Sequence, residues 1–155
     1  MADPPWGLRC ISWNVESDGN DPAVIEQQLV ELGNYDIIAR QEVHSRNVGR
    51  YGNAVRNGLG ESYRYFASNT GRSDRLMILF DSDKLRMTES RELFYHDGHR
   101  LNDWRHRSPL VAHFTDLQTG TEFLFLTVHL ARGNANCGRN KHGDLLHGPK
   151  RKHCR

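Results

Sequence analysis

The order of the first three structured segments limits this chain most strongly. Leu8 to Val15 (LRCISWNV) is rich in apolar, β-branched and aromatic residues and predicts a buried strand. Asp21 and Pro22 predict the start of a helix, as N-cap and first helical residue, and Gly33 predicts its end. Tyr35 to Ala39 predicts a second strand. A strand, a helix and a strand in this order indicate a parallel crossover unit, which is typical of α/β folds.

The rest of the chain adds mostly strands. Segment 48–59 has weaker helical character because three glycines interrupt it. A Gly-containing turn at Gln118 to Thr121 predicts a hairpin, and Leu101 to Arg107 predicts an irregular charged loop. Apolar runs or alternation predict strands over Tyr63–Ala67, Leu76–Phe80, Leu85–Leu93 (a polar edge strand), Leu110–Leu117 and Glu122–Leu130.

Length and composition are those of one folded domain. The chain has 155 residues, 37% of them hydrophobic and 26% charged, which is too apolar for a disordered chain. The net charge of +2 does not by itself indicate nucleic-acid binding. Charge is unevenly distributed, because residues 133–155 form a basic tail while the preceding part is slightly acidic.

Cysteine number and apolar run lengths bear on the cellular compartment. Three cysteines without a CxxC motif do not suggest a disulfide framework, so a reducing compartment is expected. The first seven residues lack the regions of a signal peptide, and the longest apolar stretch, Phe123 to Ala131, is too short to span a bilayer. We therefore expect a soluble protein without a membrane span, cytoplasmic by default.

Two polar side chains follow apolar strands near the N-terminus. Asn14 follows the apolar part of the first predicted strand, in Trp13-Asn14-Val15, and Glu42 follows the second strand, in Gln41-Glu42-Val43. If these strands are neighbours, both residues lie at the carboxyl edge of the sheet, where ligands bind in open α/β sheets. A carboxylate there can hold Mg²⁺, and an amide beside it can orient a phosphate or a water. The alternative is that Glu42 is only a solvated strand end and Asn14 only a turn-forming residue.

Three later residues are weaker candidates. His129 lies late in an apolar strand, where it needs a hydrogen-bond partner, and it could donate to a phosphate oxygen. Arg107, just before Ser108-Pro109, lies at a strand rim and suits phosphate geometry. Asp74 is at a similar rim position before another strand. The alternatives are that His129 is a hydrogen-bonded core histidine and that Arg107 and Asp74 are ordinary surface charges.

The tail offers histidines and cysteines but no common zinc pattern. Spacings among Cys137, His142, His147, His153 and Cys154 do not match such sites. The run at residues 150–152 is basic and could attract nucleic acid, although charge runs are usually only solvated.

Four short motifs occur in a specific order. Trp13-Asn14-Val15, Gln41-Glu42-Val43, Arg107-Ser108-Pro109 and Val128-His129-Leu130 together resemble the endonuclease/exonuclease/phosphatase (DNase I-like) superfamily over residues 8 to about 134. The resemblance implies α/β (α+β) architecture: a four-layer sandwich of two mixed β-sheets with helices outside. This chain would form an incomplete version, with residues 1–134 as the N-terminal part and 135–155 as a basic irregular tail.

The resemblance also implies roles for single residues. Glu42 matches the metal-binding glutamate for Mg²⁺ or Mn²⁺, and Asp74 falls near a second acidic position. Among the catalytic residues, Asn14 matches an asparagine beside the metal and the scissile phosphate, and His129 matches a histidine that contacts the phosphate or the leaving group. Arg107 matches a phosphate-contacting arginine. The implied activity is divalent-metal-dependent hydrolysis of a phosphodiester or phosphomonoester. Nucleic acid is one of the possible substrates.

Two later motifs of the superfamily do not occur in the sequence after the Val128-His129-Leu130 motif. These are an Asp-x-Asn, which supplies the water-activating residue, and a Ser-Asp-His near the C-terminus. We therefore expect a truncated phosphoesterase with weak or no activity, and hypothesise a reading-frame shift near Asn136. The alternative is a non-catalytic remnant or a fragment that binds phosphate or nucleic acid.

Overall fold

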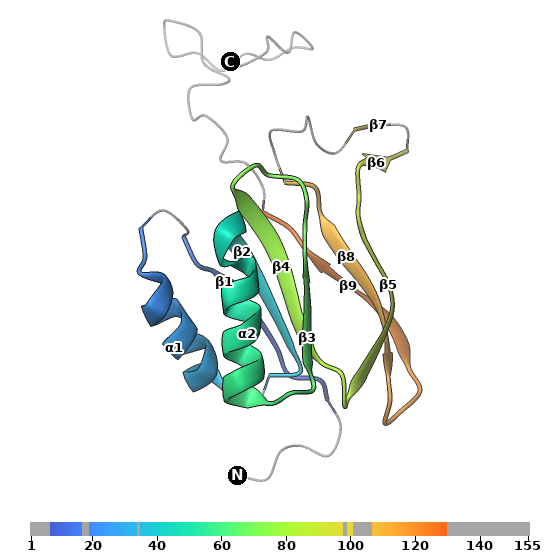
Figure 1. Ribbon diagram of the computed structural model, residues 1–155. Helices are drawn as coiled ribbons and strands as arrows, with labels where there is room; N and C mark the ends of the chain where they lie inside the picture. The colour runs from blue at the N-terminus through green and yellow to red at the C-terminus, as the bar shows by residue number, and fades with distance from the viewer. Residues whose placement is uncertain (1–6, 17–18, 34, 98, 101–106, 130–155) are drawn as a thin grey trace, which may run out of the picture.

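A computed structural model describes residues 7–16, 19–33, 35–97, 99–100 and 107–129. These residues form an α+β structure of two helices and two main sheets (Figure 1). The elements, in chain order, are β1 (Cys10–Asn14), α1 (Pro22–Leu32), β2 (Ile37–His44), the short 3-10 helix η1 (Ser45–Asn47), α2 (Val48–Leu59), β3 (Tyr63–Ala67), β4 (Asp74–Asp81), β5 (Leu85–Glu92), β6 (Tyr95–His96), β7 (His99–Arg100), β8 (Leu110–Asp116) and β9 (Glu122–Thr127).

The first sheet has the order β1-β2-β4-β3 and is mixed. Strands β1 and β2 are parallel, as the crossover unit predicts, and the other two pairings are antiparallel. The second sheet, β5-β8-β9, is antiparallel, and β6 and β7 form a small separate hairpin. The expected α+β class with a mixed sheet and outer helices is confirmed.

Two apolar cores lie on opposite faces of the first sheet. Side chains alternate along β2 and β4, so one set faces the helices and the other faces the second sheet. The helix-side core includes Ile25, Leu29, Ile38, Val55, Met77 and Leu79. The core between the sheets includes Ile37, Leu76, Ile78, Phe80, Leu110, Ala112 and Phe114. The described residues therefore form three layers: helices, sheet and sheet (Figure 1).

Local signals explain both helices. The Asp21 carboxylate accepts a hydrogen bond from the backbone N–H of Ala23, so the expected N-cap of α1 is confirmed. The glycines of α2 permit close packing: a Cβ at Gly52 would collide with the Tyr65 ring, and one at Gly58 with Val30 of α1. The glycines that weaken the helical signal of this segment thus allow α2 to approach its neighbours.

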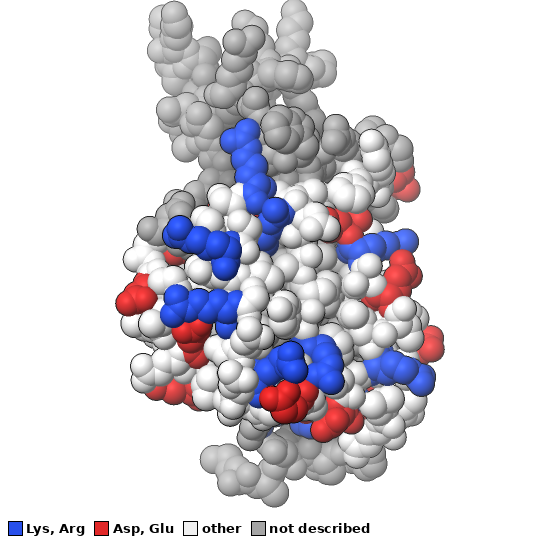
Figure 2. All heavy atoms as spheres, viewed as in Figure 1, with Lys and Arg blue, Asp and Glu red and all other residues white. Residues whose placement is uncertain are grey.

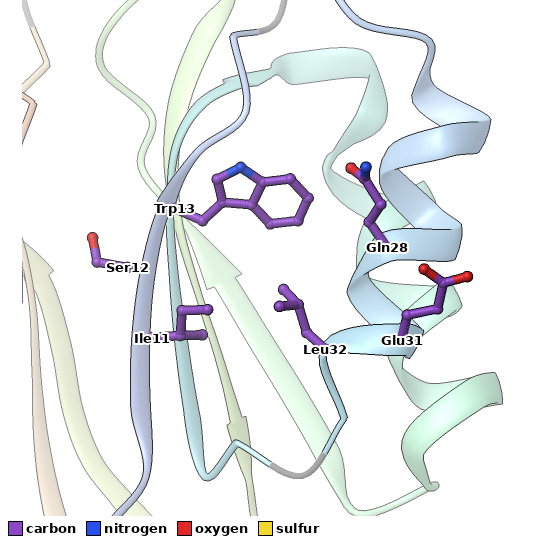
Figure 3. A pocket seen from close by; sticks show the side chains of 6 residues that line it. All are labelled: Ile11, Ser12, Trp13, Gln28, Glu31 and Leu32. Atoms are coloured by element: carbon purple, nitrogen blue, oxygen red, sulfur yellow. The ribbon is translucent and has the colours of Figure 1, made fainter.

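Strand β1 is not buried as predicted. Among the described strands β1 pairs with β2 alone, so it is an edge strand there, and its alternate residues Cys10, Ser12 and Asn14 are exposed. Figure 3 shows Trp13 pointing toward α1. A hollow beside this edge is lined by Ile11, Ser12, Trp13, Gln28, Glu31 and Leu32.

The second sheet also differs from expectation at one edge. Strand β9 ends at Thr127, earlier than the predicted Leu130. Its Phe123 and Phe125 pack toward the core, whereas Leu124 and Leu126 point outward and are 71% and 51% exposed. Strand β5 is the polar edge strand that its sequence predicts.

One buried charge was not anticipated. Arg40 is fully buried on β2, and its guanidinium carbon lies 4.7 Å from the ring centroids of both Trp13 and Tyr51. Its three side-chain nitrogens have no hydrogen-bond partner among the described residues. Burial lowers the pKa of Arg40 to about 9.

Several predictions cannot be compared with the structure. The loop at 101–106 and the tail at 135–155 lie outside the described residues. Among the helices of the described segments, none is long and apolar enough to cross a membrane.

Candidate functional site

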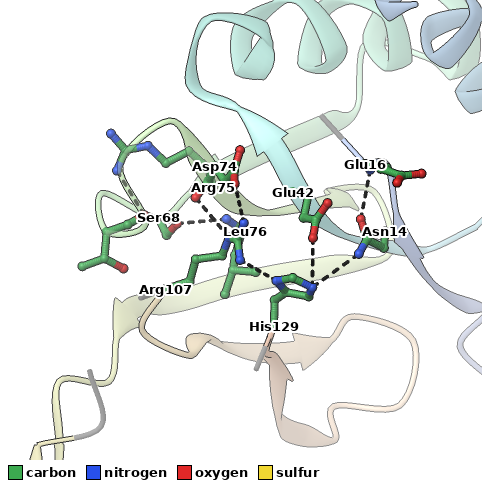
Figure 4. A network of polar contacts seen from close by, with 10 residues as sticks. Asn14, Glu16, Glu42, Ser68, Asp74, Arg75, Leu76, Arg107 and His129 are labelled. Carbon is green, nitrogen blue, oxygen red and sulfur yellow. Dashed lines mark hydrogen bonds and ion pairs between the residues drawn. The ribbon is translucent and has the colours of Figure 1, made fainter. Parts of the chain in front are cut away.

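Five predicted site residues converge where strands of both sheets end (Figure 4). Asn14 is the last residue of β1, and Glu42 lies near the end of the adjacent parallel strand β2. Asp74 begins β4, Arg107 precedes β8, and His129 follows β9. Because β1 and β2 run in parallel and pair side by side, their carboxyl ends bring Asn14 and Glu42 to the same sheet edge, as expected.

Glu42 has an unusual backbone conformation. Its φ is +57°, and the pairing of β2 with β4 shifts register between Arg40 and Val43. One extra residue on β2 there makes a β-bulge, which turns a side chain out of the regular alternation. A left-handed conformation at a non-glycine residue is costly, and such residues cluster at functional sites.

His129 is the centre of the network in Figure 4. Arg107 Nη1 donates to its Nδ1 at 2.5 Å, and its Nε2 lies 3.2 Å from Glu42 Oε1. A guanidinium can only donate, so Nδ1 must accept and the ring proton must lie on Nε2. The Nε2–H group therefore donates to Glu42. Both side chains are about one quarter exposed, at 24% and 23%.

Asn14 presents its amide nitrogen to the same place. Its Oδ1 accepts from the backbone N–H of Glu16 at 2.9 Å, which fixes the orientation of the amide. The Nδ2 group then faces His129 Nε2 at 3.4 Å. With a proton on Nε2 both groups are donors, so this is a close approach and not a hydrogen bond. Within the described segments the amide hydrogens of Asn14 have no acceptor, so they could donate to a ligand.

Arg107 is held by Asp74. Its Nη2 donates to Asp74 Oδ2 at 2.6 Å, and its Nε donates to the Asp74 backbone oxygen at 3.3 Å. Gly71 makes room for this arrangement: at φ +92°, a Cβ there would collide with the Asp74 carbonyl and with Arg107 Cγ. Asp74 therefore orients Arg107, and it does not join Glu42 as a second carboxylate facing the site.

The donor set matches magnesium in chemistry. Mg²⁺ takes oxygen ligands and often uses one or two carboxylates together with substrate phosphates and waters. Glu42 supplies one partly exposed carboxylate at the sheet edge. Within the described segments, no group of three or more His, Cys, Asp or Glu side chains is placed to hold a metal ion. Any metal here would complete its coordination with ligand oxygens and water.

Sequence reasoning did not assign a role to two residues near the site. Gln41 is 7% exposed, and its amide donates to Ser12 and Thr127. A glutamine inside an apolar strand must find such partners, and that signal was available in the sequence. Gly71 lies in a Gly-containing turn, but only the packing of Arg107 shows why a side chain is excluded there.

Comparison with known proteins finds the fold in solved structures. No family model matches the sequence, and no curated protein matches it. Three similar structures are D. rerio TDP2 complexed with single strand DNA product, the human Nocturnin catalytic domain with bound sulfate anion, and ANGEL2, a 2',3'-cyclic phosphatase, in complex with adenosine-2',3'-vanadate.

The likeness extends over most of this chain and about half of the others. TDP2 gives a TM-score of 0.63 at 21% identity, over 84% of this chain and 48% of that one. Nocturnin gives 0.65 at 12%, over 84% and 52%. ANGEL2 gives 0.55 at 14%, over 78% and 40%. The fold implied by the four motifs is confirmed, and the chain spans about half the length of TDP2 and Nocturnin.

Proposed function

Since TDP2, Nocturnin and ANGEL2 are members of the endonuclease/exonuclease/phosphatase superfamily, whose fold this chain shares, we propose that the Asn14–Glu42–His129–Arg107 cluster binds a phosphate ester with a divalent metal ion. The observation that carries the proposal is the position of His129, between the partly exposed Glu42 carboxylate and the Arg107 guanidinium. A carboxylate for a metal and several N–H donors for phosphate oxygens then meet at one sheet edge.

Each side chain has a distinct part in this proposal. Glu42 would hold Mg²⁺ or Mn²⁺, which supplies Lewis-acid polarisation of the phosphate when bound. Asn14 Nδ2 would donate toward a phosphate oxygen as negative charge develops there, and His129 Nε2–H would do the same once a metal ion takes the Glu42 carboxylate from it. Arg107 donates three of its five N–H groups to other residues that the structure describes, so two remain that could donate to a ligand. These residues form the electrophilic part of a phosphoesterase site.

Turnover by the described cluster should be low. Hydrolysis needs a group that activates water, and the other carboxylate of the network, Asp74, is bound to Arg107. Catalytic residues that act as a unit lose activity steeply when one is missing. We therefore propose weak or undetectable hydrolysis with intact metal and phosphate binding.

A nucleic acid is the favoured substrate class among phosphate esters. Figure 2 shows Lys and Arg side chains gathered over the start of α2 and the loop before β4. Arg46 and Arg72 are exposed and Arg75 is partly exposed in this region, which adjoins the strand ends of the site. The TDP2 structure contains a single strand DNA product and the ANGEL2 structure a nucleotide vanadate, which supports the same class. Clustered positive charge attracts a phosphate backbone.

Thermal unfolding of the full chain tests the proposal directly. A ligand that binds only the native state raises Tm. We expect Mg²⁺ together with a short single-stranded DNA to raise Tm, and Glu42→Gln to abolish the part that depends on Mg²⁺. Glu31→Gln, on the exposed face of α1, is the matched control. Equal Mg²⁺ responses in the wild type and Glu42→Gln would remove Glu42 from the site.

A second candidate is binding of phosphate or nucleic acid without any turnover. Glu42 already accepts the His129 N–H, so the cluster is a stable arrangement without a metal. Binding of DNA that weakens steeply with salt, with no hydrolysed product at any Mg²⁺ or Mn²⁺ concentration, favours this candidate. Metal-dependent product formation that Glu42→Gln abolishes favours the phosphoesterase.

A further inference from the structure

The side chain of Gln41 links all three strands that carry the central site residues. It is buried, and its Nε2 donates to Ser12 Oγ on β1 at 3.0 Å and to Thr127 Oγ1 on β9 at 2.8 Å. Ser12 lies two residues before Asn14, and Thr127 lies two residues before His129. Gln41 itself directly precedes Glu42.

The two hydrogen bonds of Gln41 differ in which parts of the structure they connect. Strands β1 and β2 already pair through their backbones, and Gln41 lies opposite Asn14 in that ladder. Strand β9 belongs to the other sheet and pairs with β8. The bond from Gln41 to Thr127 therefore joins the two sheets through side chains alone. Apolar packing between sheets is non-directional, whereas a buried hydrogen bond specifies one relative position.

The bulge makes such a link more important. Gln41 and Glu42 lie where the pairing of β2 with β4 shifts register, so the ladder to β4 holds them less regularly than their neighbours. His129, for its part, lies beyond the last residue of β9. Both members of the Glu42–His129 pair therefore lie just outside regular strand pairing.

We propose that Gln41 is a positioning residue, which holds the end of β9 against β2 and so keeps His129 Nε2 in hydrogen-bond contact with Glu42. Loss of the link lets the end of β9 move relative to the first sheet. The His129 ring then moves away from Glu42 and also from Arg107, which Asp74 of the first sheet holds in place. The ring thereby loses its fixed proton position, although the apolar cores remain. The consequence for phosphate-ester chemistry rests on the proposed function, whereas the effect on His129 does not.

Side-chain chemistry allows closely matched variants of the full chain. Gln41→Met keeps the length of the side chain and removes both donated hydrogen bonds. Thr127→Val keeps the shape and removes the acceptor, while Thr127→Ser keeps the hydroxyl. Ser12→Ala removes only the bond within the first sheet. Thermal unfolding shows whether each variant is folded, and Thr127→Val carries the test if Gln41→Met does not fold.

The imidazole ¹⁵N chemical shifts of His129, assigned by comparison with His129→Asn, report which ring nitrogen carries the proton. A change in stability alone does not alter these shifts in the folded protein. In the wild type we expect Nε2 protonated and Nδ1 accepting. Gln41→Met and Thr127→Val should shift both ¹⁵N resonances toward a mixture of tautomers, and Thr127→Ser and Ser12→Ala should retain the wild-type pattern. Wild-type shifts in folded Thr127→Val, or equal changes in Thr127→Ser and Thr127→Val, would overturn the proposal.

Metal binding separates this inference from the proposed function. If Mg²⁺ binds at Glu42, Gln41→Met should weaken it about tenfold, as loss of residues that orient a ligand commonly does. If the wild type binds no Mg²⁺, the proposed function fails while the NMR comparison still decides the role of Gln41.

Discussion

The guanidinium of Arg107 and the imidazole of His129, 22 residues apart in the chain, share a hydrogen bond from Nη1 to Nδ1. This bond determines which ring nitrogen carries the proton, because arginine cannot accept. It therefore directs the His129 N–H toward Glu42. The histidine and its two charged neighbours form one unit, whose parts come from three separate segments of the chain.

Removal of the Arg107 donor should release the histidine tautomer. We expect Arg107→Met to move the ¹⁵N resonances of His129 toward averaged values, since either ring nitrogen can then carry the proton. Arg75→Met is the matched control, because Arg75 donates to the Thr70 backbone oxygen and not to His129. An unchanged His129 spectrum in Arg107→Met would show that Glu42 alone orients the ring.

Substitution of Gly71 should displace the Arg107 side chain although Arg107 itself is not mutated. In Gly71→Ala the new methyl group collides with the Asp74 carbonyl and the Arg107 side chain at a positive φ. We expect a loss of about 2–3 kcal/mol in unfolding free energy, measured in urea. Gly120→Ala is the control, because its φ is +72° but open space surrounds it. Its cost should be only about 1 kcal/mol of backbone strain, and equal losses would refute the collision.

Replacement of Arg40 by a hydrophobic residue should stabilise the fold. The three side-chain nitrogens of Arg40 are buried with no hydrogen-bond partner in the described part of the chain, which costs free energy, and the flanking Trp13 and Tyr51 rings offset only part of that cost. We expect Arg40→Leu to raise the unfolding free energy by about 1–3 kcal/mol, since replacement of a buried charge by a packed apolar residue is often stabilising. Arg50→Leu, which removes an exposed ion pair with Glu26, should change it by less than about 1 kcal/mol.

The advantage of Arg40→Leu should shrink at high pH. Burial lowers the pKa of Arg40 to about 9 in the folded state, well below the ordinary value that it has in the unfolded chain. Between these values the unfolded chain binds the extra proton, so the stability of the wild type should rise as pH increases above about 9. The measurement is the difference in unfolding free energy between the wild type and Arg40→Leu at several pH values from 7 to 10. The contributions of other titrating groups cancel in this difference because both proteins contain them. A constant difference would mean that Arg40 stays protonated.

The outward face of β9 should promote self-association. Leu124 and Leu126 are exposed on β9, which among the described strands is an edge of the second sheet, and exposed apolar edges favour pairing between chains. We expect the double variant Leu124→Thr, Leu126→Thr to sediment as smaller species than the wild type at the same concentration. Leu117→Thr, at an exposed position after β8, should sediment like the wild type.

Local signals in the sequence determined much of this protein. Asp21 and Pro22 mark the start of α1, the glycine-rich α2 has the predicted bounds, and Leu110, Ala112 and Phe114 alternate toward the core. The order of the four motifs also identified the fold. These features succeed because capping, periodicity and motif order are properties of short segments.

Only the tertiary structure decided how those segments meet. Apolar character predicts that a strand packs against something, but not which neighbours it has, so β1 was expected to be buried although it is an edge strand. The burial of Arg40, the positive φ of Glu42 and the bonds of Arg107 and Gln41 follow from sheets packing on sheets. Such contacts join residues far apart in the chain, and their geometry arises only when both layers are in place.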